Sequence, residues 1–142
     1  MYGRDIAYVR PSLSPMNEKE VAGGLAPAAG YRYAEVVRDQ LFVAGQVPLD
    51  STGLLIGESD PTQQTLQCLA NLHRIIELHG FEAADIRHLT VHVVGHQADL
   101  ATAWAAVTDQ FNGHVPPATL LGASSLGYPG QLVEVDATIV RS

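Results

Sequence analysis

Apolar and polar residues alternate in several parts of the chain in a way that predicts strands. Residues 34–37 and 41–46 are apolar segments separated by a polar tripeptide at 38–40, a pattern typical of a hairpin with a three-residue connection. Residues 86–94 and 132–140 alternate, so each strand would present one apolar and one polar face. In the last strand the polar face carries two carboxylates, Glu134 and Asp136.

Two other segments have the apolar spacing of helices. In residues 60–80, leucines and isoleucines recur every two to four positions, Asp60 is suited to cap the first turn, and Gly80 is suited to a left-handed exit. A second helix is predicted to be capped by Asp99. Its apolar stripe consists of Leu100, Ala103, Trp104, Val107 and Phe111.

The predicted element order is β-β-α-β-α-β-β, with one further strand in the uncharged segment PPATLLGASSL at 116–126. Two helices on one face of a mostly antiparallel sheet make an α+β two-layer sandwich, and the other face then has no cover within one chain. Residues 1–30, interrupted by proline and glycine, are interpreted as an amino-terminal arm with little independent structure. Residues 31–142 form the single predicted domain.

Composition excludes some classes of function. The formal net charge is −7, with eight basic against fifteen acidic residues, so nucleic acid is not expected as a partner. Hydrophobic residues make up 46% of the chain, but no apolar run approaches the roughly 18 residues of a membrane span. We therefore expect no membrane association and some apolar surface covered by other subunits. The first residues lack the apolar core of a secretory signal, which predicts a cytoplasmic location.

Several reactive residue types have simpler structural explanations. Cys68 is the single cysteine and lies in the first helical pattern, where a small buried hydrophobe is the expected role. His92 and His96 are four residues apart on a strand leading into a loop, where this spacing does not make a two-ligand face, so we expect no metal site. Ser124-Ser125 lacks the G-x-S-x-G context of a nucleophile elbow.

A set of short segments extends over residues 26–140 in a fixed order. They are LFVAGQVP at 41–48 with Thr52-Gly53, Gln64-Thr65 with Asn71-Leu72, Asp85-Ile86 before Thr90-Val91, PPA at 116–118, and Val133-Glu134-Val135. Together they resemble the Rid family, also called YjgF-like or endoribonuclease L-PSP-like proteins. The resemblance implies a chorismate-mutase-like fold, a homotrimer whose sheets form an inner barrel, and ligand clefts between subunits. In these clefts, family members hydrolyse enamines or imines to a carbonyl compound and ammonia, without metal or organic cofactor.

The resemblance also assigns roles to single positions. Glu134 matches the glutamate that orients the attacking water, although a purely structural carboxylate on a strand is the alternative. Tyr31 matches a cleft tyrosine, while its neighbours Gly30 and Arg32 depart from the usual proline and serine. Thr119 stands where the family has a carboxylate-binding arginine directly after PPA.

The remaining candidate positions concern substrate binding. Main-chain groups of the strand from Thr119 to Leu121 would polarise the ligand, although ordinary ladder pairing is the alternative. Gly45 would allow a close approach to the backbone, or mark a bulge, and Arg32 is the nearest candidate for a substitute cation. An arginine holds a carboxylate through two charge-assisted hydrogen bonds of about 1.5–3 kcal/mol each. Threonine offers one neutral hydroxyl, so we expect an uncharged or larger substrate than a simple imino acid.

Three functions follow as hypotheses. The first is a cofactor-free, trimeric hydrolase of the imine or enamine deaminase type, acting on a small reactive or conjugated molecule by water addition. The second is a non-catalytic small-molecule-binding module with the same cleft. The third is RNA cleavage, suggested by the older family name and disfavoured by the net charge of −7.

Overall fold

The computed structural model describes residues 15–27 and 30–142. The predicted order of strands and long helices is confirmed. The elements are β1 (Ala34–Val37), β2 (Gln40–Val43), α3 (Pro61–Leu78), β3 (Ile86–Val94), α4 (Gln97–Gln110), β4 (Ala118–Ala123) and β5 (Val133–Val140). Three short helical segments are added, namely η1 (Pro15–Asn17), α2 (Glu18–Ala22) and η2 (Ala83–Asp85).

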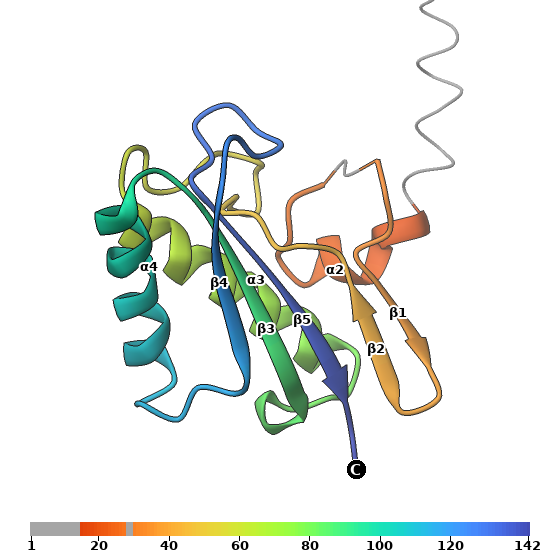
Figure 1. The fold of residues 1–142 in the computed structure, drawn as a ribbon. Helices are drawn as coiled ribbons and strands as arrows, with labels where there is room; N and C mark the ends of the chain where they lie inside the picture. Colours follow the sequence, from red (N-terminus) through yellow and green to blue (C-terminus); the bar gives the residue numbers. More distant parts are fainter. Residues whose placement is uncertain (1–14, 28–29) are drawn as a thin grey trace, which may run out of the picture.

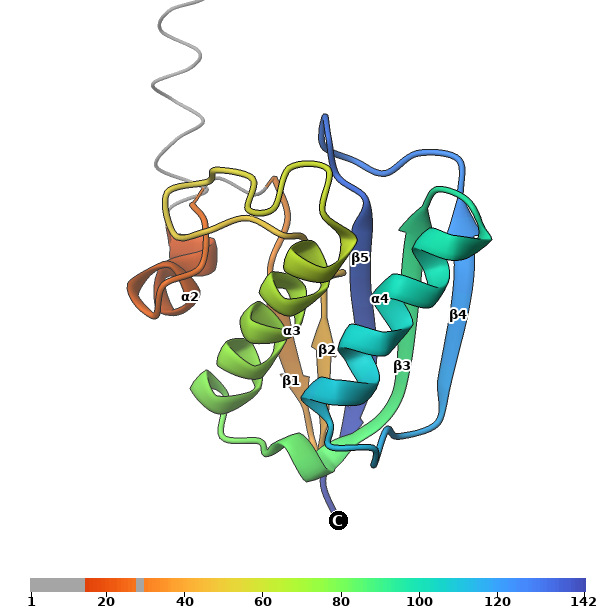
Figure 2. The ribbon, with the colours of Figure 1, turned by 90° about the vertical axis from the view of Figure 1, so that its left-hand side faces the viewer.

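The described strands form one sheet in the order β1-β2-β5-β3-β4. Neighbouring strands are antiparallel except β3 and β4, which run parallel with Thr90 opposite Thr119. Both α3 and α4 lie on the same face of this sheet (Figures 1 and 2). The α+β two-layer sandwich is therefore confirmed, and β4 lies at one edge of it.

The core lies between the helices and one face of the sheet. The apolar positions of the alternating strands are buried, as predicted, and meet the apolar stripes of both helices. Burying a Val, Leu or Ile side chain contributes about 1.5–3 kcal/mol. The central members are Leu89, Val91, Val93, Val133, Val135 and Ile139 from the sheet, with Leu69, Leu72, Ile76, Ala103 and Val107 from the helices.

Two local predictions are wrong in detail. The hairpin connection has two residues, because Gln40 pairs with Val37 as the first residue of β2, and Arg38 takes the left-handed backbone (φ 56°). Helix α4 begins one turn earlier than expected, with His96 as its N-cap. Asp99 is the third residue of that helix and accepts a hydrogen bond from the His96 N–H (2.8 Å), as in a capping box.

The ends of α3 were predicted correctly. Asp60 accepts a hydrogen bond from the Gln63 N–H (3.1 Å), and Gly80 has a φ of 78° after the helix ends.

The part of the amino-terminal arm that the structure describes is folded onto the domain. Helix α2 carries Glu20, which is buried and contacts Nε2 of His79 at 2.5 Å. Asn17 donates to the Tyr31 carbonyl (2.8 Å) and accepts from the Tyr33 N–H (2.9 Å). Residues 15–27 of the expected arm therefore take their structure against the domain, while residues 1–14 and 28–29 lie outside the described residues. The domain boundary after residue 30 stays a prediction.

Buried amide side chains on α3 anchor two loops at the same end of the sheet. Gln64, which is 0% exposed, donates to the carbonyls of Gly57 and Gly130 (3.1 Å each) and accepts from the Leu132 N–H (2.7 Å). Asn71 donates to the carbonyls of Val47 (2.9 Å) and Leu49 (3.0 Å). These bonds satisfy backbone polar groups of loop residues that lie outside the regular hydrogen-bond ladders of the sheet.

We expect Gln64→Leu to lower the free energy of unfolding by about 1–3 kcal/mol, because it leaves two carbonyls and one N–H without their partner. Chemical denaturation followed by circular dichroism measures the change. Gln63→Leu is the matched control, since Gln63 is exposed and should change stability by about 0.5 kcal/mol or less. Equal effects of the two substitutions would contradict the anchoring role.

Candidate functional site

A cavity of about 320 Å³ lies where α3 anchors these loops. It brings together three of the predicted site residues, Tyr31, Gly45 and Glu134, from segments distant in sequence. The other lining residues are Ala44, Val47, Gly127 and Tyr128. Of all seven, Glu134 alone carries a carboxyl group, so the cavity has one strongly acidic side chain in an otherwise neutral wall.

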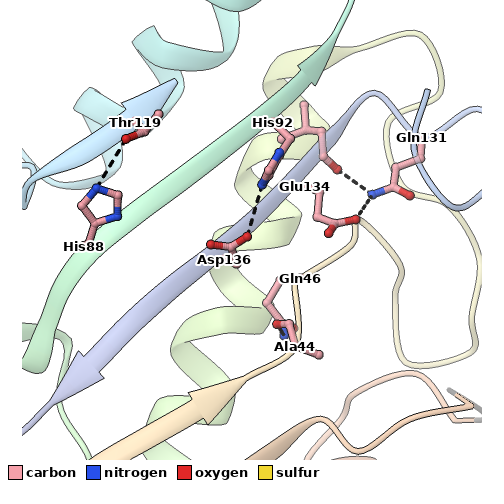
Figure 3. Close-up of polar contacts among 9 residues, drawn as sticks. Ala44, Gln46, His88, His92, Thr119, Gln131, Glu134 and Asp136 are labelled. Atoms are coloured by element: carbon pink, nitrogen blue, oxygen red, sulfur yellow. Dashed lines mark hydrogen bonds and ion pairs between the residues drawn. The ribbon is translucent and has the colours of Figure 1, made fainter. Parts of the chain in front are cut away.

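One oxygen of Glu134 is held by a neighbouring amide. Gln131, which is 4% exposed, donates from Nε2 to Oε1 of Glu134 (3.2 Å; Figure 3). It also donates to the Val133 carbonyl (3.0 Å). Its own Oε1 accepts from the Tyr128 N–H (3.1 Å). If this amide were rotated by 180°, its oxygen would face the oxygens of Glu134 and Val133, and its NH2 group would face the Tyr128 N–H. The contacts therefore determine its orientation. Gln131 therefore links the carboxylate to the Tyr128 wall.

The other oxygen of Glu134 lies against the bare backbone of Gly45. A Cβ atom at position 45 would collide with Oε2 and stand 2.9 Å from the carboxyl carbon. The segment is fixed there by two backbone bonds, from Gln46 N–H to Val135 O (2.7 Å) and from Val135 N–H to Gln46 O (3.1 Å). A side chain at position 45 would therefore require the Glu134 carboxylate to move. The expected close approach of a ligand to this backbone stays a prediction.

The two tyrosines of the cavity supply neutral hydroxyl groups. Partial burial raises the pKa of Tyr31 above its ordinary value, and the neighbouring Tyr128, Tyr33 and Glu134 add to the shift. Tyr31 therefore stays protonated at neutral pH and can donate a hydrogen bond, but it cannot serve as a base. Glu134 remains the candidate base of this cavity.

Thr119 and Leu121 do not line this cavity. Both lie on edge strand β4 and are exposed on the sheet face without helices. Leu121 pairs with His92, which pairs with Glu134, so two strand spacings of about 5 Å separate their backbones. The Thr119 hydroxyl lies 3.4 Å from Nε2 of His88, across β3 from Glu134 (Figure 3).

Arg32 follows Tyr31 in the chain but faces a neighbouring cavity. It forms an exposed ion pair with Glu35 (3.6 Å) and lines a space of about 160 Å³ together with Phe42 and Ala44. Its expected role as a substitute cation stays a prediction.

Tyr128 and Gln131 are site residues that sequence reasoning missed. In the sequence, GYPG at 127–130 is typical of a turn and carries no motif for a site. The available signal was an aromatic residue inside a turn that leads directly into the strand of Glu134. Gln131 had no comparable signal, because its role depends on three contacts that exist in the folded chain.

Neither the cysteine nor a metal-binding cluster offers an alternative reactive site in the described part of the chain. Burial raises the pKa of the Cys68 thiol well above its ordinary value, so it stays protonated and unreactive. Residues 15–27 and 30–142 contain no group of three or more His, Cys, Asp or Glu side chains placed to hold a metal ion. None of the helices in the same residues has the length and apolarity to cross a membrane.

Comparison with known proteins gives consistent matches over nearly the whole chain. The family model described as Endoribonuclease L-PSP matches residues 23–141. The RutC family protein y4sK of Sinorhizobium fredii is 28% identical over 127 residues, which cover 89% of this chain and 97% of that protein.

Solved structures match the fold with similar coverage. The YjgF gene product of Escherichia coli has a TM-score of 0.73 and 26% identity, covering 89% of this chain and 98% of that one. The Rid-family protein YyfA of Yersinia pestis has a TM-score of 0.75 and 24% identity, covering 84% and 94%. The chorismate-mutase-like fold expected from the sequence is thereby confirmed.

Gly45→Ala should push the Glu134 carboxylate out of its position, because the added methyl group occupies the space of Oε2. The carboxylate ends a flexible side chain and can move, so we expect the free energy of unfolding to fall by about 0.5–1.5 kcal/mol, from loss of its hydrogen bond with Gln131. NMR chemical shifts of Glu134 and Gln131 should change with it. Gly122→Ala is the control, since a Cβ there meets only an ordinary contact with the Val93 carbonyl (3.8 Å). An unchanged Glu134 environment in Gly45→Ala would refute the packing argument.

Proposed function

The chain belongs to the Endoribonuclease L-PSP family, and from this membership we propose that its Glu134 cavity hydrolyses a small reactive imine or enamine. Family membership supports a small-molecule deaminase-like or hydrolase-like role. The observation that carries the proposal for this chain is the placement of Glu134, with one oxygen engaged by Gln131 and the other beside Gly45 in the cavity.

The proposed reaction adds water across a C=N bond. Glu134 accepts a proton from the water as the water oxygen bonds to the imine carbon, and this proton passes to the nitrogen to give a carbinolamine. The hydroxyl group of the carbinolamine then loses its proton to the nitrogen as the C–N bond breaks. The products are a carbonyl compound and ammonia, so the reaction needs no oxidant and no cofactor. An enamine first becomes an imine by moving a proton from nitrogen to carbon. A positioned general base typically contributes 10²–10⁴-fold to such a rate.

The charge of the cavity favours an uncharged substrate. The lining contains one carboxyl group and no Lys or Arg, and position 119 carries a neutral hydroxyl. A substrate carboxylate next to Glu134 would meet a like charge without a cation to offset it. This supports a neutral imine or enamine as the substrate class.

We also propose that the chain assembles as a homotrimer. The face of the sheet opposite the helices has no cover among the described elements (Figure 2). It exposes Phe42 (50%) and Leu121 (39%) beside polar residues. Closing this face against neighbouring copies would bury that apolar surface and bring β4 of one subunit toward the cavity of another.

The proposed trimer has a direct test. Light scattering coupled to size exclusion should give about three times the chain mass of 15.2 kDa. Leu121→Asp, which places a charge on the exposed face, should shift the distribution toward smaller species while Asp109→Ala on α4 leaves it unchanged. A wild-type protein that stays a monomer at all accessible concentrations would end this part of the proposal.

Turnover is tested with a panel of neutral imines and enamines, followed by ammonia release. We expect Glu134→Gln to lower kcat by at least about 100-fold, because glutamine keeps the shape and hydrogen bonds but cannot accept the proton. Asp136→Asn is the matched control, since Asp136 lies two residues along the same strand, outside the cavity, and pairs with His92 (3.2 Å).

Two outcomes would count against the hydrolase. Full activity of Glu134→Gln would remove the proposed base. If the wild-type protein hydrolyses no compound of the panel faster than buffer does, but a compound raises its Tm, the non-catalytic binding module is favoured instead.

A further inference from the structure

The turn at residues 127–131 presents an aromatic side chain to the Glu134 cavity on a rigid support. Tyr128 lines the cavity, and its carbonyl accepts from the Gln131 N–H (3.0 Å) while its N–H donates to the Gln131 side chain (3.1 Å). The adjacent Gly130 carbonyl is bound by buried Gln64. The buried side-chain amides of Gln64 and Gln131, together with Pro129, therefore fix the turn. The backbone position of Tyr128 at the cavity wall is fixed with it.

Tyr128 also lies next to the second tyrosine of the cavity. Its charge interaction and side-chain contact are among the causes that raise the pKa of Tyr31, after burial itself. Tyr31 also makes an edge-to-face contact with Tyr33, with ring centroids 6.2 Å apart. The cavity thus has two aromatic residues with hydroxyl groups, and small residues at Ala44, Gly45 and Gly127.

We propose that Tyr128 is a specificity-determining residue which, with Tyr31, selects an uncharged, planar ligand and disfavours carboxylates. The rings offer apolar faces to a planar group, and their hydroxyls offer neutral hydrogen bonds to a carbonyl or imine. Glu134 on the same wall opposes an anion, which no cation of the lining compensates. This inference rests on the proposed function only in taking the cavity as the ligand site, since it concerns binding and not turnover.

The test uses two probes of the same shape and different charge, benzamide and benzoate. Their dissociation constants are measured by NMR titration of the Gly45 and Tyr128 amide signals at neutral pH. We expect the wild type to bind benzamide at least tenfold more tightly than benzoate. Tyr128→Phe keeps the ring and removes the hydroxyl, so the affinity for benzamide should fall several-fold while benzoate changes little.

Tyr128→Arg introduces a guanidinium into the wall and should reverse the order of the two probes, because arginine binds a carboxylate through two charge-assisted hydrogen bonds. Leu54→Arg is the charge-matched control, since Leu54 is 66% exposed and does not line the cavity. It should keep the wild-type preference for benzamide. Thermal unfolding checks that each variant is folded. If Tyr128→Arg does not fold, Tyr128→Phe still tests the role of the hydroxyl.

Several results would overturn the inference. These are equal or tighter binding of benzoate by the wild type, no binding of either probe, or an unchanged preference in a folded Tyr128→Arg protein. Its failure is distinguishable from failure of the hydrolase. A protein without turnover that prefers benzamide would refute only the hydrolase, whereas an active enzyme that prefers benzoate would refute only the role of Tyr128.

Discussion

The candidate site depends on one steric constraint, the contact between the Glu134 carboxylate and a backbone that carries no side chain at Gly45. The contact exists because the segment after β2 is bonded to β5 through Gln46 and Val135, beyond the regular ladder of the two strands. A carboxylate pressed against backbone loses part of its water and needs other partners. Gln131 supplies one of them and leaves the second oxygen on the cavity side.

Buried amides connect this contact to the rest of the fold. Gln64 and Asn71 extend from α3 into the loops on either side of the cavity, and Gln131 joins the turn to β5. Loops cannot satisfy their own polar groups as strands and helices do, so side-chain amides take that role. The result is a cavity whose walls come from the amino-terminal segment, the loop after β2 and the turn before β5, all fixed against one helix.

Charge separates this chain from the family pattern. Family membership supports a deaminase-like or hydrolase-like role. The carboxylate-binding arginine that the resemblance led us to expect is replaced by Thr119, which lies outside the described cavity. The cavity of this single chain holds one carboxyl group and two tyrosines that supply neutral hydroxyls. In the proposed function Glu134 supplies the base, and in the further proposal the tyrosine wall selects the ligand.

The sequence by itself determined the elements and the candidate base. Alternation and helical spacing depend on which side of a strand or helix meets the core, which is a local property, and the cap at Asp60 is equally local. Glu134 became the candidate base because Val133-Glu134-Val135 is the last of the ordered segments that resemble the family. The sheet order, the parallel pairing of β3 with β4 and the separation of Thr119 from the cavity were decided only by tertiary structure. So were the roles of Gln131 and Tyr128, because contacts between side chains from separate segments arise only when packing brings those segments together.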